Sequence, residues 1–71
     1  MNFSAFKDHL IAAMDDKKID ENTLAEKSGL SYISIYGYLR GNHEPNFQSL
    51  MKICNALGMT MDEFMMTQNK Q

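Results

Sequence analysis

The sequence has few of the residues that mark secreted, membrane or metal-binding proteins. Cys54 is the only cysteine, so no intramolecular disulfide can form and we expect a reducing, cytoplasmic environment. Cys54 and the two histidines, His9 and His43, lack the spacing of metal ligands. No apolar run approaches membrane-spanning length, and no signal-peptide pattern stands at the start. We therefore expect no membrane association, no metal or other cofactor, and no small-molecule substrate.

Positive charge is also scarce. Seven Lys and Arg residues against nine Asp and Glu residues give a formal net charge of −2. Proteins that hold nucleic acid mainly by charge usually have an excess of basic residues. The distribution of charge matters more than its sum, so the total does not exclude DNA as a partner. It does predict that few cationic side chains are available for phosphate contacts.

Combinations of residues that catalyse reactions are missing as well. The sequence has no paired nucleophile and base, no metal cluster and no phosphate-binding loop. Asp62 and Glu63 follow Thr60 in the pattern of a helix capping box, which assigns them to a helix start and not to acid–base chemistry. An enzyme is therefore the function class that the sequence supports least.

Apolar residues recur at helical spacing along the chain, and no segment alternates as a strand does. The pattern predicts five helices with short connections, at residues 4–16, 21–28, 32–39, 47–57 and 61–66. Four residues are expected as N-caps and three glycines as C-terminal stops: Asp20, Ser31, Asn46 and Thr60, and Gly29, Gly41 and Gly58. We expect an all-α fold, a compact five-helix bundle over residues 1–66, followed by a polar tail at 67–71.

Small residues stand where the second and third helices meet. Ala25 is expected to lie buried under the helix at 32–39, and Gly29 is expected to adopt a positive φ in the turn. Two helices joined by a tight glycine turn form a helix-turn-helix. In the helix at 47–57, Phe47 falls on the same face as Leu50 and Leu57 and is predicted to face the core.

The segment LAEKSGLS at 24–31, followed by Ile35 and the loop RGNHEP at 40–45, resembles the lambda-repressor-like helix-turn-helix proteins of the Cro/repressor type (the xenobiotic-response-element family). Phe6, Leu10 and the segment LMKICNALGMTMDEFM at 50–65 extend the resemblance over nearly the whole chain. The resemblance implies a DNA-binding protein that inserts the helix at 32–39 into the major groove. We therefore expect a prokaryotic or phage-type transcriptional regulator, acting as a repressor, that binds double-stranded DNA as a homodimer.

The resemblance also assigns base reading to the outer side of the helix at 32–39. These positions are Tyr32, Ile33, Ser34, Tyr36 and Gly37. None of them is the Arg, Gln or Asn that makes bidentate hydrogen bonds to bases, so we expect Ile33 and the tyrosine rings to pack on thymine methyl groups. Gly37 has no side chain and is expected to let the helix backbone approach the duplex closely.

Phosphate contacts are expected from Ser31, at the start of the same helix, and from Arg40, Asn42 and His43 after it. An alternative remains for the apolar outer side of this helix. It fits a helix-turn-helix module that packs on a protein partner, as an antitoxin or an antirepressor does.

Overall fold

The computed structural model describes residues 3–67, with side chains from residue 6 onward. Within these residues the chain forms five α-helices and no strand. The helices are α1 (Phe3–Lys17), α2 (Glu21–Ser28), α3 (Tyr32–Arg40), α4 (Phe47–Leu57) and α5 (Met61–Met66). The predicted all-α bundle is confirmed, and each helix begins and ends within a residue of its expected position.

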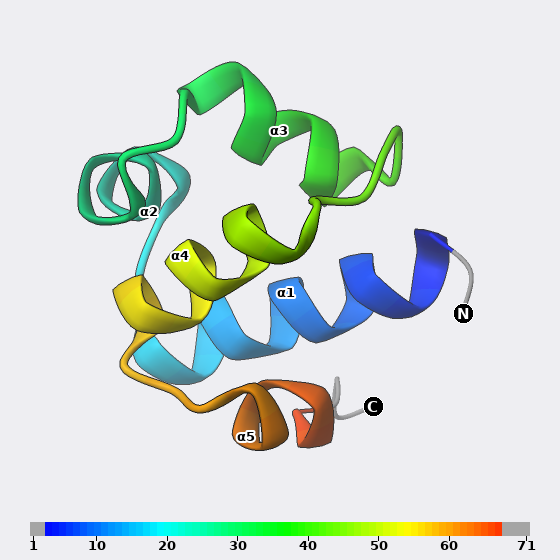
Figure 1. Cartoon of the computed structure of the whole chain (residues 1–71), viewed down its shortest axis with the longest axis vertical. Helices are drawn as coiled ribbons and strands as arrows, with labels where there is room; N and C mark the ends of the chain where they lie inside the picture. Colours follow the sequence, from blue (N-terminus) through cyan, green and yellow to red (C-terminus); the bar gives the residue numbers. More distant parts are fainter. Residues whose placement is uncertain (1–2, 68–71) are drawn as a thin grey trace.

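The five helices are arranged around α1 and α4. In Figure 1, α3 lies at the top of the molecule, α5 lies at the bottom, and α4 and α1 run between them. α2 contacts both α3 and α4, while α1 contacts α3, α4 and α5. α3 is therefore supported from below by α1 and from one side by α2, and its outer side is left facing solvent.

One hydrophobic core receives side chains from all five helices. Its largest fully buried side chains come one from each helix: Leu10, Leu24, Ile35, Ile53 and Phe64. Aromatic rings connect the two ends of the bundle through this core. The Phe6 ring meets the Tyr38 ring of α3 edge-on at 5.9 Å between centroids, and it lies 5.6 Å from the Phe64 ring of α5. The position of α3 is thus fixed by packing that extends through α1 to α5.

Local hydrogen bonds fix the turn between α2 and α3. Gly29 has a φ of 75°, as predicted, and its N–H donates to the carbonyl of Ala25 at 3.0 Å. This left-handed conformation suits glycine because it has no Cβ. The buried hydroxyl of Ser28 accepts from the N–H of Leu30 at 3.2 Å, and Ser31 then caps α3. α2, this turn and α3 form the predicted helix-turn-helix.

Two expectations about burial are corrected. Phe47 is 67% exposed, because it is the first residue of α4. Side chains in a helix lean toward its N-terminus, so a residue in the first turn projects beyond the core that later turns cover. The core side of α4 is formed instead by Ile53, Cys54 and Leu57. Ala25 is only half-buried, although it does pack against the core.

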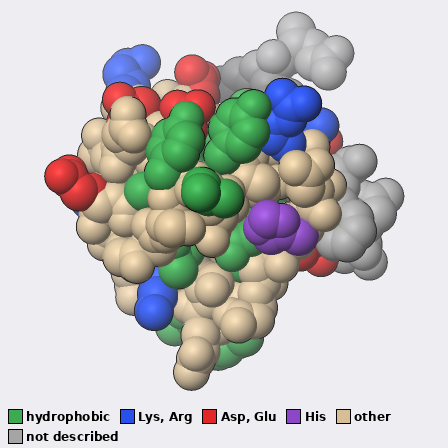
Figure 2. All heavy atoms as spheres, turned by 90° about the horizontal axis from the view of Figure 1, so that it is seen from above, with side chains coloured by type: hydrophobic (Ala, Val, Ile, Leu, Met, Phe, Trp, Pro, Cys, Tyr) green, Lys and Arg blue, Asp and Glu red, His purple; other side chains and the backbone are tan. Residues whose placement is uncertain are grey.

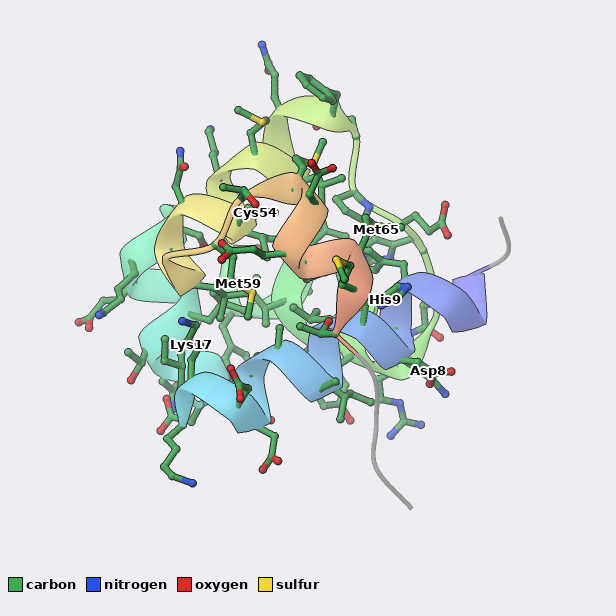
Figure 3. All side chains as sticks on the ribbon, turned by 90° about the horizontal axis from the view of Figure 1, so that it is seen from below. Asp8, His9, Lys17, Cys54, Met59 and Met65 are labelled. Atoms are coloured by element: carbon green, nitrogen blue, oxygen red, sulfur yellow. The ribbon has the colours of Figure 1, made fainter. Side chains whose placement is uncertain are left out.

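α5 is held at both ends. The predicted capping box of Thr60 and Glu63 is present at its start. At its end, the hydroxyl of Thr67 donates to the carbonyl of His9 at 3.1 Å, and Nδ1 of His9 donates to the carbonyl of Thr67 at 2.7 Å. His9 lies on α1 beside the end of α5 (Figure 3). Of the expected tail, Thr67 is therefore tied to α1, and residues 68–71 lie outside the described residues.

Candidate nucleic-acid interface

The outer side of α3 is mostly apolar. Ile35 and Tyr38 point into the core, whereas Tyr32, Ile33 and Tyr36 are exposed to 45%, 79% and 44%. Figure 2 views the molecule from the side that carries α3. It shows hydrophobic side chains gathered there, with basic side chains and a histidine at their margin. This surface is convex, as expected for the outer side of a helix, and acidic as well as basic side chains border it in the same view.

Tyr32, Tyr36 and Arg40 form a row along α3. They are spaced four residues apart, so each lies above the previous one on the same side of the helix. The two tyrosine rings stack with centroids 6.2 Å apart. The Arg40 guanidinium lies 5.5 Å from the centroid of the Tyr36 ring, and Nη1 donates to the Tyr36 hydroxyl at 3.2 Å. The row therefore orients the positive charge of Arg40 at the end of the aromatic surface.

Few hydrogen-bonding groups accompany this apolar surface. Ser34 is half-buried, and its N–H donates to the hydroxyl of Ser31 at 3.1 Å. The Ser31 hydroxyl in turn donates to the Ser34 hydroxyl at 3.0 Å. Both serines are thus engaged in capping α3, and Ile33 has no polar atom in its side chain. The outer side of α3 offers methyl groups and rings to a partner, with tyrosine hydroxyls as its main polar groups.

Gly37 does not lie open to solvent. It is buried, and the imidazole of His43 covers it. A Cβ on Gly37 would clash with Cε1 of that ring and would lie 3.0 Å from both Nδ1 and Nε2, so the ring would have to move. The expectation that the Gly37 backbone is open to an approaching duplex is therefore corrected, because the His43 ring occupies the space.

Three of the four predicted phosphate contacts lie close together around the end of α3. Arg40, Asn42 and His43 are exposed, and the N–H of Asn42 donates to the carbonyl of Gly37 at 2.9 Å. Ser31 is exposed at the opposite end of the helix. Sequence reasoning missed the packing of His43 on Gly37. The signal for it was a glycine inside a helix, where glycine is a poor helix former.

The described residues outside α3 and the loop after it show no reactive thiol, metal cluster or membrane-spanning helix. Cys54 is 2% exposed, and burial raises the pKa of its thiol, which keeps it neutral. Between residues 3 and 67, no group of three or more His, Cys, Asp or Glu side chains is placed to hold a metal ion. In the same part of the chain, no helix has both the length and the apolarity needed to cross a membrane.

Comparison with known proteins identifies the family. Residues 9–70 match the Cro/C1-type HTH DNA-binding domain. An uncharacterized HTH-type transcriptional regulator of Bacillus subtilis (strain 168), YqaE, is 28% identical over 57 residues, covering 80% of this chain and 49% of that protein. The chain thus spans about half the length of the curated relative it matches. No solved structure matches it. The match over residues 9–70 includes the helix-turn-helix of α2 and α3, and the chain belongs to the Cro/C1-type helix-turn-helix DNA-binding domains.

Proposed function

We propose that this chain is a transcriptional regulator that binds double-stranded DNA by inserting α3 into the major groove. The observation that carries the proposal is the exposed outer side of α3 in a Cro/C1-type DNA-binding domain. The major groove, about 12 Å wide, admits an α-helix. We further propose that it acts in the cytoplasm as a prokaryotic or phage-type repressor.

In this proposal Tyr32, Ile33 and Tyr36 meet the edges of the bases. Ile33 is the most exposed of the three, at 79%, and contributes only apolar atoms. Thymine is the base that presents a methyl group in the major groove. Sequence preference therefore comes mainly from contacts with thymine methyl groups, supplemented by the tyrosine hydroxyls. Phosphates on either side are bound by Ser31 at one end of α3 and by Arg40, Asn42 and His43 at the other.

In vitro selection of bound duplexes from a random pool tests sequence-specific binding directly. A homodimer with two copies of α3 is expected to enrich an inverted repeat whose half-sites are centred about 34 Å apart, one turn of DNA. Sedimentation of the complex is expected to give two chains per duplex. A single enriched half-site bound by one chain would contradict the homodimer, and a pool without enrichment would contradict sequence-specific binding.

Replacing Arg40 with alanine is expected to weaken binding to operator and random duplex alike. Each phosphate that a cationic side chain neutralises contributes about −0.9 to the slope of log K against log salt concentration. The slope is therefore expected to become shallower by about 0.9 for each protomer bound. Fluorescence anisotropy at several salt concentrations measures both effects.

Lys17→Ala is the matched control for Arg40→Ala. It removes one positive charge from the last residue of α1. Lys17 lines a surface pocket together with Glu63 and Met66 of α5, the helix at the opposite end of the molecule from α3 (Figure 1). This control is expected to leave the salt slope unchanged. Equal changes in slope for the two variants would mean that Arg40 acts only through net charge and contacts no phosphate.

A second candidate function rests on the exposed apolar side chains. Ile33 and Phe47 are 79% and 67% exposed, and the chain carries a net charge of −2. A protein partner that covers α3, as for an antitoxin or an antirepressor, fits these observations. A selection without enrichment, together with equally weak binding of duplex by the parent and Arg40→Ala, would favour this function over DNA binding.

A further inference from the structure

His43 is seated against α3 although it belongs to the loop that follows the helix. Its ring lies over Gly37 and meets the Tyr38 ring edge-on, with centroids 4.7 Å apart. His43 itself remains exposed. The imidazole is thus in contact with the helix through part of its surface, while the rest of the ring faces solvent.

The contact depends on the identity of residue 37. A Cβ at this position would come within 3.0 Å of both ring nitrogens of His43 and would meet Cε1 as well. Contacts this short force one group to move, so any larger residue would displace the imidazole. Glycine is among the poorest helix formers, yet it occupies the interior of α3. The missing Cβ leaves the space that the His43 ring fills.

The backbone next to His43 is also tied to α3. The N–H of Asn42 donates to the carbonyl of Gly37 at 2.9 Å, and the N–H of Gly41 donates to the carbonyl of Tyr38 at 3.1 Å. These bonds fold the loop back over the end of the helix. The loop at Asn42 and His43 is thus held against the end of α3 by backbone hydrogen bonds and by the contact of the His43 ring.

We propose that Gly37 is a positioning residue, which seats the His43 imidazole beside the outer side of α3 so that a ring N–H donates to a DNA phosphate. The proposal rests on the proposed function, because it requires α3 to lie in the groove. An imidazole has an N–H donor in either neutral tautomer and in the charged form, and a phosphate oxygen is its natural acceptor. Gly37 then acts on DNA only through His43.

A double-mutant cycle tests this coupling. The affinity of the selected operator is measured by anisotropy for the parent, Gly37→Ala, His43→Ala and the double variant. His43→Ala is expected to lose about tenfold in affinity per protomer, the size of a hydrogen bond to a charged group. Gly37→Ala alone is expected to lower operator affinity by a similar factor. In a protein that already carries His43→Ala, adding Gly37→Ala is expected to cause no further loss of affinity. Thermal melting followed by circular dichroism verifies that all four proteins are folded under the binding conditions.

The contact of the His43 ring with Gly37 and Tyr38 is tested without DNA. In free Gly37→Ala, the NMR signals of the His43 imidazole are expected to shift, because the ring leaves the edge of Tyr38. The signals of His9 are the internal control. His9 is hydrogen-bonded to Thr67 at the end of α5, so its signals are expected to stay in place. Unchanged His43 signals would contradict the claim that Gly37 determines the position of the His43 ring.

Loss of operator affinity on Gly37→Ala in both backgrounds would overturn the coupling, and so would no loss in either. A parent that selects no duplex would overturn the proposed function and the phosphate contact with it. The shift of the His43 signals would still report whether Gly37 positions the His43 ring. A failure of DNA binding and a failure of the Gly37–His43 contact are therefore distinguishable.

Discussion

Replacing Ile33 with alanine is expected to remove most of the discrimination between the selected operator and random duplex. Ile33 is the most exposed side chain of α3, at 79%, and only its methyl and methylene groups can contact a base. Alanine lacks three of the carbon groups of isoleucine, and each buried CH2 group contributes about 0.8 kcal/mol, so the loss is about 2.4 kcal/mol, or about 60-fold in affinity, for each protomer. Affinity for random duplex and the salt slope are expected to stay close to those of the parent, because the phosphate contacts are intact.

The thymine methyl groups provide the complementary change on the DNA. Uracil differs from thymine only by the absence of this methyl group. Replacing the thymines of the operator with uracil is therefore expected to weaken binding of the parent and to change binding of Ile33→Ala much less. Ile11→Ala is the matched control, since Ile11 is a partly exposed isoleucine on α1, at 39%. If Ile33→Ala prefers the operator as strongly as Ile11→Ala does, α3 does not read the sequence.

Replacing Phe64 with alanine is expected to destabilise the fold by about 3–5 kcal/mol. The Phe64 ring is fully buried, and its centroid lies 5.6 Å from that of Phe6 and 6.0 Å from that of His9. Natural domains have about 0.05–0.15 kcal/mol of stability per residue, so a chain of 71 residues loses a large share of its total. Chemical denaturation followed by circular dichroism measures the loss.

Met66→Ala in the same helix is the control for Phe64→Ala. Met66 is 77% exposed, and surface substitutions usually change stability by less than about 0.5 kcal/mol. A Phe64→Ala variant as stable as Met66→Ala would show that α5 does not pack on α1 as described.

The helices were predictable because their starts and stops are local signals. Asp20 accepts from the N–H of Thr23 at 2.8 Å, a bond that also lowers the pKa of the Asp20 carboxyl. Asn46 accepts from the N–H of Ser49 in the same way. Each interaction involves residues three apart in the sequence, so composition at the helix start is enough to predict it. The exposure of Tyr32, Ile33 and Tyr36 on α3 follows equally from helical spacing, whereas the burial of Gly37 does not.

The features that escaped prediction depend on contacts between a helix and a separate loop, or on where a helix begins relative to the core. Helical spacing places Phe47 with Leu57, but spacing does not say whether the core extends as far as the first turn of α4. Gly37 looked like an open position because a glycine inside a helix indicates a close contact without saying which group makes it, and here that group is the ring of His43. Which base each side chain of α3 meets depends on the DNA partner, so no property of the chain alone determines it.

Contact between Ile33 and a thymine methyl group on the bound operator tests the central claim most directly. NMR of protein labelled only at isoleucine δ-methyl groups, in complex with the operator, is the measurement. The account predicts that the Ile33 methyl signal shifts and shows a nuclear Overhauser effect to a thymine methyl, while the Ile11 signal stays in place. A complex in which the Ile33 signal is unchanged, and the Ile11 signal moves instead, would contradict the insertion of α3 into the major groove.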